Sequence, residues 1–269
     1  INTIIHFASF KAVAESIAKP LEYYNNNVNG TIQLLKLCQK YDIKGVIFSS
    51  SATVYGNSKP PLFENSQTGV GITNPYGQSK FMVENILQDF SKSSNTKIIS
   101  LRYFNPVGAH PSGLLGDDPN GIPNNLMPYL LRVAIKNNID QDYNDIYKYL
   151  NIFGNDYNTT DGTGVRDFIH VVDLAQAHVS ACNHILNQSN NYEVYNIGTG
   201  KGTSVLELVK TFESVNNVNL PYKIKDRRPG DLDTVYCNCD KANKELLWYA
   251  KKSIENICED SYNFVKNTN

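Results

Sequence analysis

The strongest constraint on the fold of this chain is an alternation of short apolar segments with longer helical patterns over its first hundred residues. Thr3–Ala8, Gly45–Ser49 and Lys97–Tyr103 are short and apolar, as expected of buried strands. Amphipathic patterns over Pro20–Tyr41 and Pro75–Phe90 lie between them and predict helices. Strands that alternate with helices favour parallel βαβ units, so the sequence predicts an α/β fold with a doubly wound parallel sheet.

The second half of the chain shows a shorter and more mixed pattern. Prolines break the segment Asn105–Asn125, and Asn138–Leu150 is polar enough to indicate an inserted surface loop. Gly198–Ser204 lacks the spacing of a phosphate loop and is predicted to be a strand-to-helix turn with Ser204 as the helix cap. Further helices are expected at 127–137, at 172–186, from 204 onward and at an exposed C-terminal position, with strands at 167–171 and 194–197. Because no linker separates independent domains, we predict a smaller, interleaved second lobe beside the sheet.

Charge and cysteine content exclude several classes of protein. The 25 Lys and Arg residues nearly balance the 26 Asp and Glu residues, so the chain has no field for binding nucleic acid or an anionic membrane. No run of about 18 apolar residues predicts a membrane span. The five cysteines, at 38, 182, 237, 239 and 258, form no C-x-x-C pair, which argues against a metal site and favours buried, neutral thiols. Free thiols are typical of a reducing compartment, so we expect a cytoplasmic protein.

The first candidate for chemistry is the pair Tyr76 and Lys80 at the start of a predicted helix. Residues four apart share a helix face, so the two side chains can converge. A phenol has a pKa of about 10, too high for a base near neutrality, but a neighbouring ammonium stabilises the phenolate. An exposed Tyr and Lys on a solvated face is the alternative for this pair taken alone. His6 and His170 lie in strand patterns and are predicted to pack, and His110 is expected in an exposed loop.

A serine-rich strand end supports the catalytic interpretation. Ser49–Ser51 closes a predicted strand shortly before Tyr76, and ligands of parallel sheets gather beyond the carboxyl ends of strands. A Ser, a Tyr and a Lys that meet there can move a hydroxyl proton while a cofactor takes hydride.

Several longer sequence motifs accompany the Tyr76–Lys80 pair in the order in which a known family has them. With them the chain resembles the extended short-chain dehydrogenase/reductase superfamily, and within it the UDP-glucose (UDP-galactose) 4-epimerases. The matching segments, which cover nearly the whole chain, are 6–13, 20–31, 49–56, 102–113, 121–129, 161–171 and 227–231.

The resemblance implies NAD as cofactor and C4 epimerisation of UDP-galactose and UDP-glucose through a 4-keto-hexose. Tyr76 as phenolate takes the 4-hydroxyl proton, directly or through Ser51, while Lys80 bonds the nicotinamide ribose and keeps the phenol acidic. The matching cofactor-contact positions are Phe7, Ala8, Lys11, Asn26, Ser51, Tyr76, Lys80 and Phe104. The matching substrate positions are Asn105, Asn125, Leu126, Phe153, Arg166, Arg228 and Asp231.

Three of the substrate positions have a clear physical role. Arg166 and Arg228 offer guanidinium forks to a diphosphate, and Asp231 can accept the protons of the uridine ribose hydroxyls. Their alternative is surface ion pairing, Arg166 with Asp167 and Arg227 with Asp231, worth roughly 0–1 kcal/mol each.

The resemblance also implies the domain arrangement and a homodimer. An NAD-binding Rossmann-type domain is expected over 1–106 with a return segment at about 165–186, and an interleaved UDP-sugar-binding lobe over 107–269. In the family, the helix at Pro20–Tyr41 and the helix after Tyr76 form the dimer contact, so an isologous homodimer is expected.

The chain departs from the family at its start. The first strand of the family, its Gly-rich turn and the acidic residue after it have no counterpart in the first 60 residues. We therefore expect an N-terminally truncated sheet with an exposed apolar edge at Thr3–Ala8. The chain as it stands is expected to bind NAD poorly and to be inactive.

Several other functions stay open. A modest side chain at Val235 leaves room for UDP-N-acetylglucosamine, so a bifunctional epimerase is one alternative. A nucleotide-sugar 4,6-dehydratase needs acidic residues where this chain has Ala52 and Thr53, and a UDP-glucuronate epimerase or decarboxylase matches the long motifs less well. From a different class, a catalytically silent binding or scaffold protein could keep the fold.

Overall fold

The computed structural model describes residues 1–140, 142–228 and 230–268. Gln141 of the predicted insertion and Pro229 of the 227–231 motif therefore lie outside the described residues. The chain forms two compact units, which are described separately. The first consists of Ile1–Phe104, Ala175–Ile197 and Cys237–Tyr249, and the second of Asn105–Leu174, Gly198–Tyr236 and Ala250–Asn269. The predicted boundaries differ, because 165–174 belongs to the second unit and 187–197 and 237–249 belong to the first.

The first unit is built on a parallel four-stranded sheet, which confirms the predicted α/β class. Its strand order is β1 (Thr3–His6), β2 (Gly45–Ser51), β3 (Lys97–Tyr103) and β8 (Tyr192–Ile197). Strand β2 ends at Ser51, as the prediction that Ser49–Ser51 closes the strand requires. Strand β1 lies at the edge of the sheet, where Ile5 and Phe7 are exposed.

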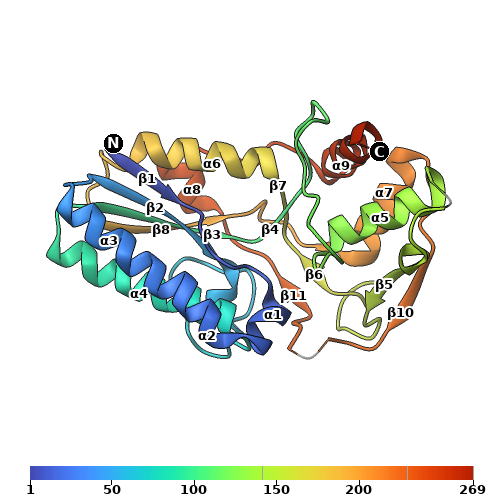
Figure 1. Cartoon of the computed structure of the whole chain (residues 1–269), viewed down its shortest axis with the longest axis horizontal. Coiled ribbons are helices and arrows are strands. Elements are labelled where there is room, and N and C mark those ends of the chain that lie inside the picture. The colour runs from blue at the N-terminus through green and yellow to red at the C-terminus, as the bar shows by residue number, and fades with distance from the viewer. Residues whose placement is uncertain (141, 229, 269) are drawn as a thin grey trace. The chain divides into compact units, whose positions relative to one another are not determined.

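Helices cover both faces of this sheet, as a doubly wound arrangement requires. Helices α3 and α4 lie on one face, and α6 and α8 lie on the other (Figure 1). The core on the α3–α4 side joins Val46 and Ile98 of the strands to Leu35, Val83 and Leu87 of the helices. The helices are α1 (Val13–Ala18), α2 (Pro20–Tyr23), α3 (Gly30–Lys40), α4 (Pro75–Ser93), α6 (Val171–His184, of which 175 onward belongs to this unit) and α8 (Asp240–Glu245).

The predicted single helix over Pro20–Tyr41 is wrong in one respect. Between α2 and α3 the chain forms a π-helical turn, η1 (Tyr24–Asn29). Such turns are rare and add one residue to each hydrogen-bonded loop. The amphipathic pattern continues through the turn, so periodicity alone gave no sign of it.

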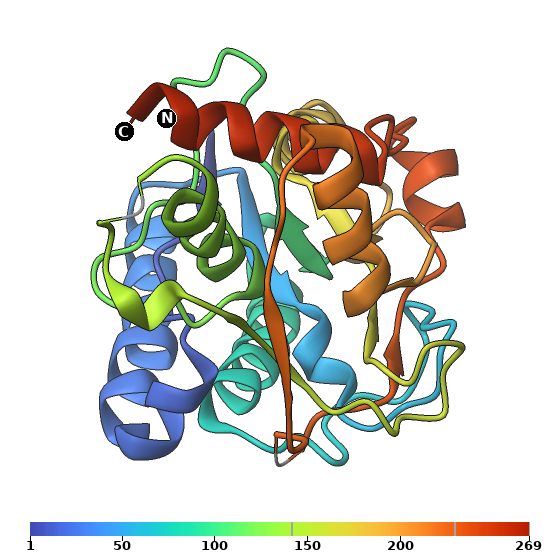
Figure 2. The same ribbon diagram turned by 90° about the vertical axis from the view of Figure 1, so that its right-hand side faces the viewer.

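The second unit has its core among three helices. Helices α5 (Leu126–Asn138) and α7 (Val205–Asn216) pack with α9 (Ile254–Thr268), which runs across both (Figure 2). Ser204 caps α7, as predicted, and the structure adds a capping box in which Glu207 bonds back to the Ser204 backbone. Small sheets complete the unit: β5 (Leu150–Phe153) with β10 (Tyr222–Lys225), β4 (Asn105–Val107) with β7 (Phe168–His170), and β6 (Val165–Arg166) between β11 (Thr234–Val235) and β9 (Thr203–Ser204).

One expectation for the second unit needs correction. The C-terminal helix was predicted to be exposed, but α9 buries Ile257, Cys258 and Val265 in the core. Most described residues of the segment Asn138–Leu150 are exposed, as predicted for a surface loop, but Tyr147, in the 3-10 turn η3 (Asp145–Tyr147), is only 3% exposed. Its ring packs edge-on against Tyr129 of α5, so this aromatic residue anchors the segment to the core.

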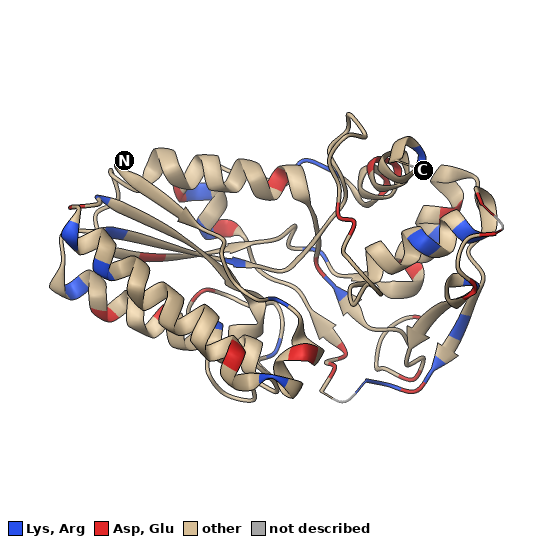
Figure 3. Cartoon of the chain, viewed as in Figure 1, with Lys and Arg blue, Asp and Glu red and all other residues tan. Residues whose placement is uncertain are grey.

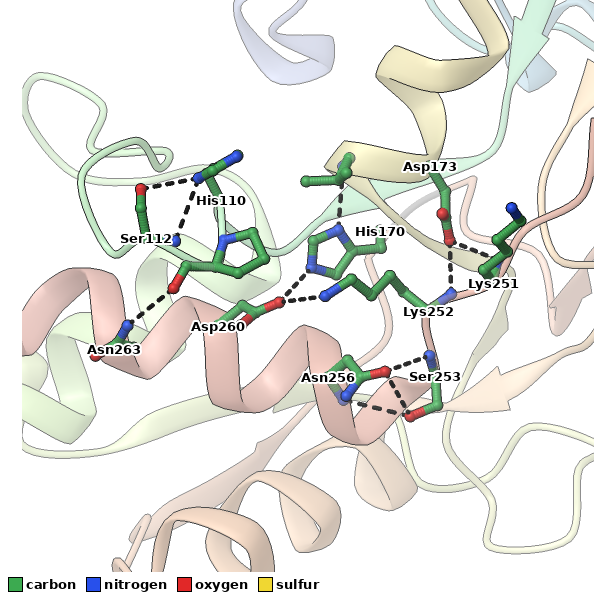
Figure 4. Close-up of polar contacts among 12 residues, drawn as sticks. His110, Ser112, His170, Asp173, Lys251, Lys252, Ser253, Asn256, Asp260 and Asn263 are labelled. Carbon is green, nitrogen blue, oxygen red and sulfur yellow. Dashed lines mark hydrogen bonds and ion pairs between the residues drawn. The ribbon is translucent and has the colours of Figure 1, made fainter.

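His170 is completely buried, as predicted, and its contacts fix its protonation. Its Nδ1 accepts the backbone N–H of Val172 (3.0 Å), so Nε2 carries the proton and donates to Asp260 (3.1 Å). Burial lowers the pKa of His170, although Asp260 opposes the shift. Asp173, three residues on, accepts the backbone N–H groups of Lys251 and Lys252 (Figure 4). These bonds fasten the start of α6 to the segment that leads into α9.

Charges of both signs are interspersed along the elements of each unit (Figure 3). Among the described residues, no helix combines the length and apolar character needed to cross a bilayer. Cys38, Cys237, Cys239 and Cys258 are buried, as predicted, but Cys182 is only half-buried. His110 is exposed, also as predicted.

Candidate functional site

The tip of β2 presents Ser51 with its hydroxyl already oriented. Ser51 caps the 3-10 turn η2 (Ala52–Tyr55), and its Oγ accepts bonds from the backbone N–H (3.2 Å) and the hydroxyl (3.0 Å) of Thr53. Because both acceptor positions of the oxygen are engaged, its own O–H is left to donate. Ser51 shares a side-chain hydrogen bond with Tyr76, so the serine is the donor and the phenol oxygen the acceptor.

The first turn of α4 places Tyr76 beside this tip. Asn74 caps the helix by accepting the N–H of Gly77 (2.8 Å), and Pro75 occupies the first helical position, where proline is favoured. A Cβ on Gly77 would lie 3.2 Å from Cβ of Thr53, so glycine permits the close approach of α4 to the turn after β2. Thr53 and Gly77 therefore shape the site, although sequence reasoning assigned them no part in it.

Lys80, one turn after Tyr76, lies inside the first unit. Its side chain is buried at 3% exposure, and Nζ donates to the backbone carbonyl of Ser49 on β2 (2.6 Å). Nζ is 4.8 Å from the ring centroid of Phe48 and 5.9 Å from that of Tyr76. The structure thus brings Ser51, Tyr76 and Lys80 together as the spacing predicted.

The electrostatics of the three residues differ from the prediction. Burial raises the pKa of Tyr76, and the bond from Ser51 opposes this shift. Burial also lowers the pKa of Lys80 to about 7. The lysine therefore does not by itself make the phenol acidic in the chain alone, because desolvation disfavours both charged forms.

Replacing Lys80 by Met is expected to flatten the pH dependence of stability. Its pKa is lowered to about 7 in the folded chain from 10.5, so between these values the unfolded chain binds a proton that the folded chain does not. Stability must then rise with pH, by up to about 1.4 kcal/mol per pH unit from this group. Urea unfolding at pH 7 and pH 9 measures the rise, which should be about 2 kcal/mol smaller in K80M. Exposed Lys244→Met serves as control, and equal pH slopes for K80M and the wild type would contradict the expectation.

Asn27 links the candidate site to the loop after β1. Its amide accepts the N–H of Phe10 (2.8 Å) and donates to the carbonyl of Phe10 (3.1 Å) and to Oγ of Ser79 (3.0 Å). Ser79 in turn donates to the carbonyl of Tyr76 (2.7 Å). Asn27 is buried, whereas the predicted Asn26 is half-buried and donates to the Asn27 side chain. The π-helical turn carries both residues.

The other predicted cofactor-contact residues of the first unit lie around the ends of its strands. Phe7, 56% exposed, directly follows β1, and its ring lies 4.7 Å from that of His178 on α6. Ala8 and Lys11 are exposed in the loop that Asn27 holds, and Phe104 is buried after β3. No contact recorded among the described residues joins Phe7, Ala8 or Lys11 to Tyr76.

In the second unit, the predicted substrate residues Arg166, Arg228, Asp231 and Phe153 form one cluster. The Asp231 carboxylate lies 2.9 Å from Nε of Arg228 and 3.7 Å from Nη2 of Arg166. Arg228 also covers the ring of Phe153, 5.1 Å from its centroid. The alternative ion pairs considered from sequence are not those recorded, because Arg227 pairs with Asp156 and Asp233.

Arg166 is the best-held member of this Arg–Asp cluster. Its Nη1 donates to the carbonyls of Val165 (2.8 Å) and Leu232 (2.9 Å), and its side chain is 18% exposed. Burial lowers the pKa of Arg166, while Asp231 opposes the shift. A guanidinium that is fixed and partly desolvated is suited to binding an anion.

The remaining predicted substrate residues are not joined to the Arg–Asp cluster by any contact among the described residues. Asn105 opens β4 and is half-buried. Asn125 precedes α5 as an exposed N-cap whose side chain makes no capping bond, and Leu126 begins that helix half-buried. The side-chain amide of Asn125 therefore does not cap the helix, although asparagine at the N-cap position commonly does so.

Comparisons with known proteins agree on one family. Residues 1–198 match the model of the NAD dependent epimerase/dehydratase family. The chain is 52% identical to the UDP-glucose 4-epimerase of Bacillus subtilis over 264 residues, which is 97% of this chain and 74% of that protein. It is 50% identical to UDP-glucose 4-epimerase 2 of Arabidopsis thaliana, over 99% of this chain and 73% of that protein.

A solved structure gives the same result. The crystal structure of UDP-glucose 4-epimerase from Bifidobacterium longum in complex with NAD+ and UDP superposes with a TM-score of 0.91 at 50% identity. The match covers 100% of this chain and 78% of the other. The chain belongs to the NAD-dependent epimerase/dehydratase family, and within it to the UDP-glucose 4-epimerases.

Proposed function

We propose that this protein interconverts UDP-galactose and UDP-glucose by inverting C4 of the hexose through a 4-keto intermediate. The observation that carries the proposal is the meeting of Ser51, Tyr76 and Lys80 at the tip of β2. The names of the relatives give the substrate, since the matched proteins are UDP-glucose 4-epimerases.

The residues present fit the nicotinamide end of NAD. An ammonium has three N–H donors, and the carbonyl of Ser49 is the one acceptor recorded for Lys80 among the described residues. Two donors therefore remain for ribose hydroxyls. We assign further cofactor contacts to the predicted residues Phe7, Ala8, Lys11, Asn26 and Phe104. When bound, NAD supplies the redox chemistry, oxidising C4 and then reducing it from the opposite face.

The chain's own residues manage the proton of the 4-hydroxyl. Ser51 donates to the Tyr76 oxygen, which lowers the pKa of the phenol and stabilises the phenolate once it forms. The phenolate accepts the hydroxyl proton, directly or through Ser51, and returns it when the ketone is reduced. General base catalysis of this kind contributes about 10²–10⁴-fold.

Conversion of UDP-galactose to UDP-glucose, with NAD present, tests the proposal directly. Product analysis should show an isomer of unchanged mass, because Ala52 and Thr53 offer no acid and base for elimination of water. A product 18 mass units lighter, the mass of one water, would favour a dehydratase and contradict the proposal. The assay uses the protein at its natural length.

We assign substrate binding to Asn105, Asn125, Leu126, Phe153, Arg166, Arg228 and Asp231, with Arg166 and Arg228 on the diphosphate. Arg166→Met is expected to weaken UDP binding about 10- to 100-fold, because a charge-assisted hydrogen bond contributes roughly 1.5–3 kcal/mol. Calorimetric titration with UDP measures the loss. The control Lys136→Met removes a cation of the same unit that pairs with Asp145 (2.8 Å) and should leave UDP affinity unchanged. Equal affinity of R166M and the wild type would refute the assignment.

We also infer a homodimer through α3 and α4. Leu37 on α3 and Met82 on α4 are exposed, and a shallow groove between these helices is lined by Ile32, Leu35, Lys36, Gln39, Ile86 and Phe90. Apolar side chains of this kind on neighbouring helices suit an isologous contact. Sedimentation of the wild type and of Leu37→Glu compares their oligomeric states: the wild type should be a dimer and the variant a monomer.

We also place the protein in the cytoplasm, because buried cysteine thiols are typical of a reducing compartment.

A further inference from the structure

Behind Lys80, the first unit contains a buried ion pair that the proposed function does not use. Glu84 follows Lys80 by one turn of α4, and its carboxylate accepts Nε (3.0 Å) and Nη2 (2.7 Å) of Arg102 on β3. A third bond comes from Oγ of Ser50 on β2 (2.5 Å). Both charged side chains are only 6% exposed. The pair therefore connects the catalytic helix with two strands of the sheet.

Stability alone does not account for this pair. Replacing a buried ion pair by apolar side chains of similar volume is often neutral or stabilising, because desolvating two charges is costly. The place of Glu84 is more informative. Residues four apart on a helix are neighbours, so the carboxylate of Glu84 lies on the same face as Lys80. Its partner Ser50 lies between Ser49, which accepts the bond from Lys80, and Ser51.

Of the titratable groups near Lys80, Glu84 is the one that we expect to carry a negative charge near pH 7. On α4 these groups are Tyr76 and Glu84, and on β1 His6. On β3, Arg102 bonds to Glu84, and Tyr103 interacts with Ser49. Burial and Lys80 lower the pKa of His6 to about 4, so this histidine is neutral near pH 7. Burial raises the pKa of Tyr103 well above its ordinary value, so it is neutral as well. Burial lowers the pKa of Lys80, and Glu84 opposes that shift.

We propose that Glu84, held in place by Arg102, is a positioning residue that favours the charged form of Lys80 in its buried site. The inference rests on the proposed function, in which the ammonium binds the nicotinamide ribose. An uncharged amine would lose the electrostatic support that a phenolate at Tyr76 needs.

The test follows the titration of Lys80 itself, in the chain without cofactor or substrate. Lysine labelled with ¹³C at Cε reports the charge, and the signal that disappears in Lys80→Met assigns it. The wild-type midpoint is expected near pH 7. In E84Q/R102Q, which replaces the ion pair by a neutral pair, the midpoint should fall by about one pH unit, because Glu84 rather than Arg102 is the charge that acts on Lys80. Glu84→Asp retains the charge and should titrate close to the wild type.

A matched control separates this effect from general damage. Glu193→Gln removes a carboxylate that pairs with Lys241 in the same unit (2.5 Å) and should leave the Lys80 midpoint unchanged. A folded E84Q/R102Q chain with a wild-type midpoint would overturn the proposal. If the double variant does not fold, the single variant Glu84→Gln is titrated instead, and a wild-type midpoint in that variant would overturn the proposal. Failure of the proposed function gives a different result. In that case the wild-type protein does not convert UDP-galactose, but Lys80 still titrates as expected.

Discussion

Replacing Tyr76 by Phe is expected to lower kcat for UDP-galactose by about 10²–10⁴-fold, which is the usual contribution of a general base. The variant keeps the ring that packs beside Lys80 and loses only the oxygen that Ser51 bonds. Because that oxygen acts on the proton being transferred, KM should change much less than kcat. Steady-state kinetics at several UDP-galactose concentrations separate the two constants.

The control for this variant is Tyr41→Phe, which removes a phenol oxygen from an exposed tyrosine of the same unit. It should keep wild-type kcat and KM. A Y76F protein with more than a tenth of wild-type kcat would show that another group accepts the proton. Ser51 is then the first residue to examine, since its hydroxyl is the one bonded to Tyr76.

Asp167→Ala is expected to destabilise the second unit by about 3–5 kcal/mol. The Asp167 carboxylate is completely buried and accepts the N–H of Thr199 (2.7 Å), its hydroxyl (2.7 Å) and the N–H of Gly200 (3.0 Å). Alanine leaves three partly buried donors without this acceptor, and the loss of several hydrogen bonds to a buried carboxylate costs an amount of this order. Urea unfolding, followed by far-UV circular dichroism, measures the change in the free energy of unfolding.

The companion variant Asp167→Asn keeps one carbonyl oxygen and should lose less stability than D167A. Asp145→Ala provides the control, because Asp145 pairs with Lys136 at the surface and its loss should leave the unfolding midpoint unchanged. Equal midpoints for D167A and the wild type would mean that water replaces the carboxylate without cost.

Local patterns predicted most of the fold. Strand β3 matches its predicted residues, and the cap at Ser204 followed from side-chain chemistry that acts within one turn. The burial of Tyr147 could not be read in the same way, because its segment is polar and only the ring packs inward. The buried face of α9 likewise depends on where α5 and α7 lie.

The candidate site was predictable where its residues form a motif. Tyr76 and Lys80 are four apart on one helix, and their convergence needs no tertiary information. Thr53 and Glu84 were not predicted to matter, because their partners Ser51 and Arg102 come from other elements. Asp231 was predicted as a substrate residue from the family resemblance, but its pairing with Arg166 was not, because the two residues come from segments far apart in the sequence.

The position of the Asn27 amide depends on the number of residues in the π-helical turn at Tyr24–Asn29. Each residue advances an α-helix by about 100°, so removing one residue from the turn would rotate the amide at Asn27 away from Phe10 and Ser79. Substitutions at the exposed positions of the turn do not change its length and therefore leave the orientation of Asn27 unchanged. This stretch of chain should therefore tolerate changes of residue identity far better than insertions or deletions.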